Sequence, residues 1–308
     1  MRTVVVSRFG GPEVLQPHDS PAPDPDPGQV AIDVAVVEVL FLDTQRRAGW
    51  GQEYFPAEPP FVPGTGVGGT VVGEPGRRVL ARTGDGGAYA ERVVVAAEEA
   101  IDVPDGLDLG VALAALHDGV LALDRLDRSG LRHGTRVLVT AAAGSVGQWV
   151  VPLAAAAGAE VTGTAGGAAK ADAVRAQGAA RVVDHRADGW ADGIGPFDVV
   201  FDGSGGAVGR AALARTVDGG LFHAYGAASG EFGADRGERA VTVVGVQQEI
   251  DDERWRRLVR RGLDLLVAGR VHPVVGQRVP LEQAARAHAA MERREVVGKT
   301  VLTVGADR

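Results

Sequence analysis

Cysteine is absent from this chain of 308 residues, and its absence excludes several kinds of chemistry at once. Without a thiol the chain can form no disulfide bond, provide no thiolate metal ligand and use no cysteine nucleophile. No two histidines stand at the spacing of a metal site, so the sequence predicts no metal centre. Six of the seven histidines are interpreted as structural or solvated: His18, His117, His133, His223, His272 and His288.

Lysine and long apolar runs are also scarce. Lysine occurs only at positions 170 and 299, and the net charge of −8 is unfavourable for a nucleic-acid partner held through its phosphates. No run of 18 apolar residues occurs, and the N-terminus MRTVVVSRFGG lacks a long apolar segment with a cleavage site. We therefore expect a cytoplasmic protein with no membrane segment. The length allows two domains with separate cores.

What the sequence does contain is a strand–turn–helix–strand pattern at its centre. An apolar run at 137–140 is followed by a turn of small residues, a helical segment at 146–157 and a second strand at 160–164. The turn reads A-x-G-x-x-G, at Ala142, Gly144 and Gly147. Small residues let the backbone approach a pyrophosphate, and the helix N-terminus offers free N–H groups to it. This context predicts a dinucleotide site rather than a merely tight turn.

The end of the second strand indicates which dinucleotide is bound. A site for NAD usually places Asp or Glu about 20 residues after the glycines, where it binds the ribose 2′-hydroxyl. Residues 162–169 contain no acid; Gly166-Gly167 leads instead to Lys170, a cation that suits a 2′-phosphate. The alternative interpretation is a solvated lysine at a helix start. We predict NADPH as the cofactor.

Strands and helices alternate through residues 117–269. Beyond the central unit we expect strands at 181–183, 198–202, 220–224 and 241–246, and helices at 170–177, 208–216 and 253–268. Such alternation predicts an α/β fold with a doubly wound parallel sheet of the Rossmann type. We therefore assign residues 117–269 to an NADPH-binding Rossmann domain.

The first 116 residues are mostly β without this alternation. The proline-rich segment 17–27 is expected to be a loop, because each proline lacks a backbone donor. The segment GTGVGG at 64–69 imitates a dinucleotide fingerprint, but a strand follows it and no helix opens there, so we reject it as a phosphate site. The tail 270–308 again contains strands and is predicted to rejoin residues 1–116 in one discontinuous β-rich domain.

The chain resembles the zinc-independent quinone oxidoreductase branch of the medium-chain dehydrogenase/reductase superfamily over nearly its whole length. The resemblance rests on FGGPEVL, PFVPGTGVGGTVV, VLVTAAAGSVG, GGLFHAYGAASG and the ending VVGKTVLTV, in matching order and spacing. It implies a GroES-like catalytic domain, a Rossmann domain and NADPH as cofactor. It also implies a homodimer that pairs the strand at 241–246 edge to edge. The glutamate of the zinc-dependent P-G-x-E-x-x-G motif is Gly66 here, which again excludes catalytic zinc.

The resemblance also carries cofactor roles to individual positions. The pyrophosphate would be contacted by Gly144, Ser145, Val146 and Gly147, and the 2′-phosphate by Lys170 and Arg294. His185 stands where the family has the tyrosine of N-Y-R, and it either contacts the phosphate or is simply solvated. Gly226 and Val246 fall where the backbone passes the nicotinamide. The complete predicted cofactor set is Ala142, Gly144, Ser145, Val146, Gly147, Thr164, Gly167, Lys170, His185, Gly203, Gly226, Val246 and Arg294.

Departures from the family pattern concern the catalytic end. The N-x-x-D motif reads Leu40-Phe41-Leu42-Asp43, the aromatic two residues beyond is Gln45, and Leu121 replaces the threonine of G-L-T-A. Asp43 is predicted to orient, Gln45 to donate a hydrogen bond and Tyr54 to act as general acid. Tyr54 can equally be an amphipathic residue that packs, and solvent can supply the proton.

Two functions of different classes follow. The first is an NADPH-dependent reductase of an α,β-unsaturated carbonyl compound or a quinone, and the apolar departures favour a specialised enone. The second is a non-catalytic NADPH-binding protein with a structural or sensing role, motivated by the few acid–base groups. A serine hydrolase is set aside because the chain has no G-x-S-x-G elbow.

Overall fold

The computed structural model describes residues 1–232, 237–245 and 249–305, and the chain divides into two compact units. Unit 1 comprises Met1–His117, Val259–Val267 and the residues from Val274 onward. Unit 2 comprises Asp118–Leu258 and Ala268–Pro273. Helix α7 (Asp252–Val267) contributes to both. The assignment of catalytic and cofactor roles to domains at 1–116 with 270–308 and at 117–269 stays a prediction.

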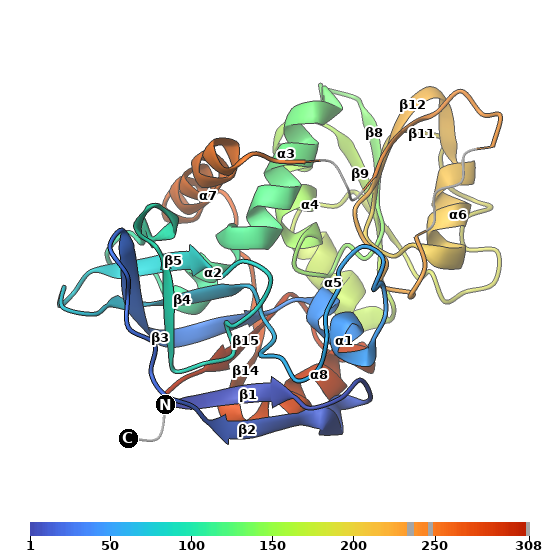
Figure 1. The fold of residues 1–308 in the computed structure, drawn as a ribbon. Helices are drawn as coiled ribbons and strands as arrows, with labels where there is room; N and C mark the ends of the chain where they lie inside the picture. Colours follow the sequence, from blue (N-terminus) through green and yellow to red (C-terminus); the bar gives the residue numbers. More distant parts are fainter. Residues whose placement is uncertain (233–236, 246–248, 306–308) are drawn as a thin grey trace. The chain divides into compact units, whose positions relative to one another are not determined.

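Unit 2 is built on a parallel sheet whose described strands follow the order β10-β9-β8-β11-β12-β13 (Figure 1). Counted along the chain, this is the order 3-2-1-4-5-6 of dinucleotide-binding sheets, in which ligands bind beyond the carboxyl ends of the strands. The strands are β8 (Arg136–Val139), β9 (Glu160–Thr164), β10 (Arg181–Val183), β11 (Phe197–Asp202), β12 (Thr216–Ala224) and β13 (Thr242–Val244).

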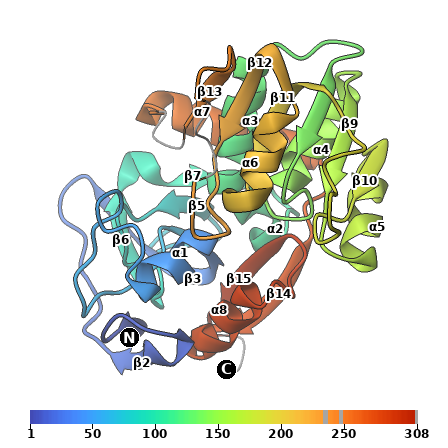
Figure 2. The same cartoon turned by 90° about the vertical axis from the view of Figure 1, so that its right-hand side faces the viewer.

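Helices flank this sheet and bury its apolar side chains. Helix α4 packs on β8, β9 and α3, α5 packs on β10, and α6 packs on β11 and β12 (Figure 2). Leu138, Val200 and Phe222, from three neighbouring strands, belong to one fully buried cluster. The helices are α3 (Val120–Ser129), α4 (Gly147–Ala156), α5 (Ala168–Ala176) and α6 (Gly206–Ala214).

Unit 1 is a mostly antiparallel β structure. Its main sheet follows the order β14-β15-β3-β4-β5-β7, with β6 also paired to β3, and β1 pairs with β2 in a separate ribbon. The valine-rich β3 is the longest strand and lies at the centre. The strands are β1 (Arg2–Val6), β2 (Leu15–Asp19), β3 (Gln29–Val39), β4 (Gly66–Val71), β5 (Arg78–Arg82), β6 (Arg92–Ala96), β7 (Ile101–Asp102), β14 (Val275–Pro280) and β15 (Lys299–Thr303).

The helical segments of unit 1 are short. The α-helices are α1 (Phe41–Ala48), α2 (Leu109–Leu113) and α8 (Ala284–Glu292). The 3₁₀ turns are η1 (Pro12–Val14), η2 (Ala97–Glu99) and η4 (Leu281–Gln283), and the π-helical turn η3 (Ala115–Gly119) crosses the boundary to unit 2.

Three local features of the fold were not predicted. Pro17 lies inside β2 rather than in a loop, which is tolerated because β2 belongs to a two-stranded ribbon and has a free edge. Apolar residues recur at helical spacing over 109–116 and 119–126; helices α2 and α3 lie there, and the π-helical turn η3 separates them. Helix α1 was not expected: the carboxylate of Asp43 caps it by accepting from the N–H of Leu40 (2.8 Å), and left-handed Gly49 ends it.

Candidate cofactor and catalytic site

The turn after β8 has the shape that a phosphate-binding turn requires. Gly147 stands so close to the preceding backbone that a Cβ there would lie 2.3 Å from the carbonyl oxygen of Ala142. Ala142 in turn donates its N–H to the carbonyl of Thr164 (3.1 Å), which ties the turn to the end of β9. Ala141 takes a left-handed conformation with φ of 49°. Small residues are therefore dictated by backbone geometry at this point.

Helix α4 begins at this turn, and its first donors are available. The N–H groups of Ser145, Val146 and Gly147 donate to no residue in the described part of the chain. Free amides at a helix N-terminus, together with the helix dipole, favour an anion such as a pyrophosphate. The turn can hold the phosphates through its backbone alone.

The hydroxyl of Ser145 forms a hydrogen bond within the protein. Its Oγ donates to the buried carboxylate of Asp118 at 2.7 Å. The hydroxyl hydrogen is thus committed within unit 2, and only the backbone N–H of Ser145 is left to meet a phosphate. Asp118 itself was not among the predicted site residues.

The carboxyl ends of β8 and β11 are joined by a buried hydrogen bond. The Thr140 hydroxyl donates to Asp202 at 2.6 Å and accepts from the N–H of Gly203 at 3.0 Å. Burial raises the pKa of Asp202, against the effect of the hydrogen bonds it accepts. Gly226 lies against this segment, since a Cβ there would lie 2.3 Å from the carbonyl oxygen of Gly203. The structure thus brings the predicted residues Gly203 and Gly226 together at one end of the sheet.

The loop after β9 gathers basic side chains. The Gly166-Gly167 turn leads into α5, whose first turn carries the half-buried Lys170. From β10 the neighbouring segment supplies His185, whose ring lies 3.5 Å from the position of a Cβ on Gly166, and Arg186, whose guanidinium lies 3.1 Å from that of Gly167. Arg186 was not among the predicted site residues, although it directly follows His185 in the segment that the resemblance places at the phosphate.

One acid also reaches this loop. Asp184 accepts from the N–H of Gly167 (3.1 Å) and pairs with Arg186 (2.6 Å). The hydrogen bonds from Arg186 and Gly167 hold the pKa of Asp184 far below its usual range. Residues 162–169 themselves contain no acid, but the carboxylate of Asp184, which follows the next strand, lies beside the loop. Its charge is offset by Arg186, so Lys170 adds a net positive charge.

These residues fit a bound dinucleotide. The hydroxyl of Thr164, at the end of β9, is buried and has no hydrogen-bond partner among the described residues. A buried hydroxyl without a partner costs free energy unless a ligand or water satisfies it. This hydroxyl, the free amides of the turn and the glycines that keep the backbone bare lie along the same edge of the sheet. Val246 lies outside the described residues.

The predicted catalytic side chains belong to unit 1 and occupy different environments. Asp43 is buried in α1, and Gln45 is half-buried in the same helix. Tyr54 lies in the turn that follows and is 44% exposed. The hydrogen bond with Glu53 raises the pKa of Tyr54 above that of a free phenol. Arg294 stacks its guanidinium over the ring of Phe41, 4.3 Å from the centroid.

A charged cluster at the centre of unit 1 was not predicted. The carboxylate of Glu38, on β3, is fully buried, pairs with Lys299 on β15 (2.6 Å) and contacts Nδ1 of His117. A Cβ on Gly66 would lie 2.1 Å from Oε1 of Glu38. The place of the family's motif glutamate is therefore filled by a carboxylate from the neighbouring strand. A sequence signal was present, since Glu38 is the one acid in the second half of a valine-rich strand and Lys299 is one of two lysines.

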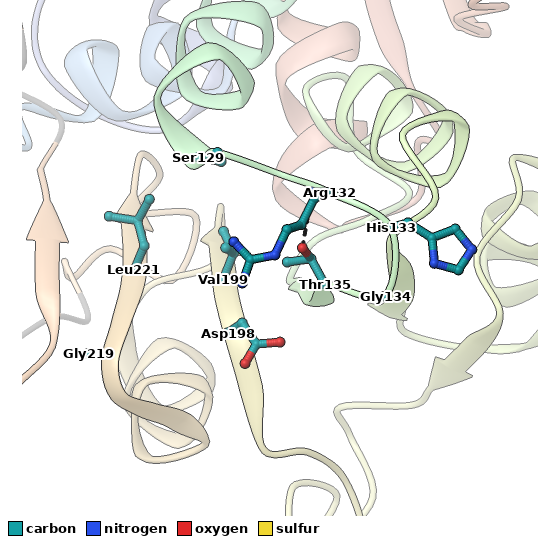
Figure 3. A pocket seen from close by; sticks show the side chains of 10 residues that line it. Ser129, Arg132, His133, Gly134, Thr135, Asp198, Val199, Gly219 and Leu221 are labelled. Atoms are coloured by element: carbon teal, nitrogen blue, oxygen red, sulfur yellow. Dashed lines mark hydrogen bonds between the residues drawn. The ribbon is translucent and has the colours of Figure 1, made fainter.

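A separate pocket of about 280 Å³ lies in unit 2 (Figure 3). It is lined by the loop before β8 and by the amino-terminal parts of β11 and β12; Arg132 points toward Val199 and Asp198, whereas His133 points away. Dinucleotides bind at the carboxyl ends of such strands. This pocket is therefore distinct from the candidate cofactor site.

The described part of the chain has neither a metal-binding cluster nor a membrane-spanning helix. No group of three or more histidine, aspartate or glutamate side chains there is arranged to hold a metal ion. No helix in the described ranges has both the length and the apolar character needed to cross a membrane.

Comparison with known proteins places the chain among oxidoreductases. A family model described as zinc-binding dehydrogenase matches residues 177–302. A 2-haloacrylate reductase from Burkholderia is 32% identical, with 97% of each chain covered. A quinone oxidoreductase from Pseudomonas aeruginosa is 29% identical, covering 98% of this chain and 99% of the relative.

Solved structures agree with these sequence relatives. A mycobacterial protein solved with NADPH is 31% identical and superposes with a TM-score of 0.88, covering 98% of this chain and all of that one. Escherichia coli quinone oxidoreductase, also solved with NADPH, is 26% identical with a TM-score of 0.89 and the same coverage. The predicted α/β fold, a Rossmann sheet with a β-rich unit, is confirmed.

A β-rich unit joined to a dinucleotide-binding unit defines the medium-chain dehydrogenase/reductase class. The chain belongs to the zinc-independent quinone oxidoreductase-like branch of that superfamily. The resemblance stated from the sequence is thus confirmed.

Proposed function

We propose that this protein is an NADPH-dependent oxidoreductase that transfers hydride to a carbon–carbon double bond conjugated with a carbonyl group. The observation that carries the proposal is the edge of the parallel sheet in unit 2. There the glycine turn with free amides stands beside a loop that bears Lys170, His185 and Arg186. The relatives solved with NADPH support the same cofactor.

Bound NADPH supplies the hydride, and the protein supplies binding and orientation. Backbone N–H groups of the turn at Ser145–Gly147 hold the pyrophosphate, and the close approach of Gly203 and Gly226 leaves the backbone bare near the nicotinamide. Lys170 provides the charge for the 2′-phosphate, with Arg186 beside it. Thr164 offers its buried hydroxyl to the cofactor. Arg294 and Val246 keep their proposed cofactor roles.

The substrate class is supported from two directions. The relatives include quinone oxidoreductases and a reductase of 2-haloacrylate, which is itself an alkene conjugated with a carboxyl group. Leu40 and Leu121 replace an asparagine and a threonine of the family pattern, so two polar side chains are lost at the catalytic end. We therefore favour an enone or enoyl compound over a quinone. A small-molecule substrate, a homodimer and a cytoplasmic location belong to the same proposal.

The cofactor assignment is tested by titrating the protein with NADPH and with NADH and following nucleotide fluorescence. Wild type should prefer NADPH, and Lys170→Ala should lose at least about tenfold in NADPH affinity, because one charge-assisted contact is worth about 1.5–3 kcal/mol. NADH affinity should hardly change. Arg175→Ala is the matched control, since Arg175 lies on the same helix but is exposed and paired with Asp172.

Turnover is tested with a panel of quinones, enones and enoyl thioesters. Oxidation of NADPH with at least one acceptor supports the proposal. Tight and selective NADPH binding without turnover of any acceptor would favour the second candidate, a non-catalytic NADPH-binding protein. Equal affinity for the two nucleotides would contradict the roles given to Lys170 and its neighbours.

A further inference from the structure

An aromatic ring lies at the carboxyl edge of the parallel sheet in unit 2. Tyr225 directly follows β12, whose last residue, Ala224, pairs in register with Asp202, the last residue of β11. The N–H of Tyr225 donates to the carbonyl of Asp202 at 3.0 Å. A Cβ on Gly203 would lie 2.9 Å from the hydroxyl oxygen of Tyr225. The ring therefore covers Gly203, and it occupies the space that a side chain at that position would need.

The hydroxyl of this ring has no hydrogen-bond partner among the described residues, although Tyr225 is only 8% exposed. Two carboxylates act on it electrostatically, but each accepts from another hydroxyl: Asp118 from Ser145, and Asp202 from Thr140. The oxygen of Tyr225 is not fully enclosed, so a ligand can reach it. A largely buried polar group without a partner costs free energy unless a ligand or water satisfies it.

The surroundings of the hydroxyl define the chemistry of the group that it can bind. Burial raises the pKa of Tyr225 above the usual range of a phenol, and the negative charges of Asp202 and Asp118 add to the rise. The hydroxyl therefore keeps its proton at neutral pH and can donate one hydrogen bond. The same negative charges are unfavourable for a phosphate at this point. An uncharged acceptor, such as the oxygen of a hydroxyl or an amide, suits the site.

The order of the strands indicates which half of a dinucleotide passes this point. In sheets of the order 3-2-1-4-5-6, the pyrophosphate lies at the turn after strand 1, and the adenosine ribose lies at the end of strand 2. These strands are β8 and β9 here. The dinucleotide crosses the sheet where the strand order reverses, so its other half extends toward the ends of β11 and β12. Gly203 and Tyr225 directly follow these two strands.

We propose that the hydroxyl of Tyr225 donates a hydrogen bond to an uncharged oxygen in the nicotinamide riboside half of NADPH. This role rests on the proposed function. The oxygen belongs either to a ribose hydroxyl or to the carboxamide of the nicotinamide, and both offer the same acceptor chemistry. The bond satisfies a hydroxyl that the protein leaves without a partner, and it holds this half of the cofactor at the edge of the sheet. Tyr225, Gly203 and the two carboxylates all belong to unit 2.

The test compares wild type with Tyr225→Phe, which keeps the ring over Gly203 and removes only the hydroxyl. Titration calorimetry measures the affinity for NADPH and for two fragments of it. NADPH affinity should fall about three- to tenfold, the usual worth of one neutral hydrogen bond. Affinity for adenosine 2′,5′-bisphosphate, which lacks the nicotinamide riboside, should stay at the wild-type value. The third ligand, 2′-phospho-ADP-ribose, lacks only the nicotinamide: a loss equal to that for NADPH assigns the bond to the ribose, and no loss assigns it to the carboxamide.

Thermal unfolding separates this role from a structural one. Without nucleotide, Tyr225→Phe should unfold at the wild-type temperature or above it, because the hydroxyl has no partner in the protein to lose. With NADPH, the rise in unfolding temperature should be smaller for the variant than for wild type. Thr216→Val is the matched control. It removes a buried hydroxyl from the other end of β12, where Thr216 donates to the carbonyl of Ala212 at 3.3 Å. The control should unfold at a lower temperature and keep the wild-type affinity for NADPH.

The outcomes distinguish this contact from the cofactor assignment on which it rests. A wild-type protein that binds no NADPH overturns both. A wild-type protein that binds NADPH, with Tyr225→Phe equal to it in affinity, overturns the contact alone. A variant that loses the same factor in affinity for adenosine 2′,5′-bisphosphate as for NADPH, or that unfolds at a lower temperature without nucleotide, shows a structural role for the hydroxyl and also contradicts the contact.

Discussion

At the scale of single residues, Asp43 combines a structural task with an unfavourable charge. Burial raises the pKa of its carboxyl from 3.8 to about 6; the negative charge of Glu38 adds to this rise, and the N–H of Leu40 opposes it. The folded state therefore binds the proton more tightly than the unfolded state between about pH 4 and pH 6. Stability falls as the pH rises through that window, by about 3 kcal/mol in total, and is then constant.

Asp43→Asn should remove this cost and keep an oxygen that accepts from Leu40. The variant should be more stable than wild type by about 2–3 kcal/mol at about pH 8 and equal to it at about pH 4. Urea unfolding at both pH values measures the difference. Asp105→Asn, which replaces an exposed aspartate of the same unit, is the control and should shift neither value. A loss of stability at about pH 8, where the carboxyl of Asp43 is ionised, would show that the cap needs the charge.

At the scale of elements, the geometry of the turn into α4 leads to opposite predictions for two of its residues, Gly147 and Ser145. Gly147→Ala places a methyl group 2.3 Å from the carbonyl oxygen of Ala142, so the turn must move and NADPH affinity should fall at least about tenfold. Ser145→Ala removes a hydroxyl whose hydrogen is already committed to Asp118, so affinity should change less than about threefold. Nucleotide fluorescence measures both, with circular dichroism as a check of folding. Equal losses would mean that the Ser145 hydroxyl turns toward the phosphate when the cofactor binds.

The same turn shows what the sequence can predict. Its glycine spacing is required by the backbone geometry of the turn itself. Such a local requirement can be recognised in a sequence because the residues concerned are close together in the chain. Helix α1 was missed because its cap is an aspartate at the third helical position, and its polar residues Arg46 and Arg47 are buried by partners distant in sequence. In the same way, β4 contains residues 66–69 of the false fingerprint GTGVGG. There glycine is needed because Glu38 and other side chains of β3 fill the space.

The residues of the candidate site fall into the same two groups, those positioned by local geometry and those positioned by long-range contacts. Ala142, Gly144 and Gly147 were found because one turn contains them. Arg186, Asp118 and the pair of Glu38 with His117 were missed because each depends on contact between segments separated by about 20 to nearly 80 positions. A single sequence records residue types at these positions but not which strands become neighbours.

At the scale of the whole molecule, the parallel sheet of unit 2 ends at β13. Among the described strands, β13 pairs with β12 on one side and has no neighbour on the other. An unpaired edge presents a row of backbone donors and acceptors that a second copy can satisfy, and identical edges meet about a two-fold axis. We propose that the protein is a homodimer joined at this edge.

Light scattering coupled to size-exclusion chromatography tests the dimer directly. One chain has a mass of 31.7 kDa. The mass measured for wild type should be about twice that value. Val244→Glu places a charge on the half-buried end of β13, where two copies of the edge would bring like charges together, so it should shift the protein toward the monomer. Val72→Glu is the control, because Val72 is an exposed valine of unit 1 outside any strand. If Val244→Glu leaves the mass unchanged, copies of the chain associate through another surface; a monomeric wild type would exclude the dimer.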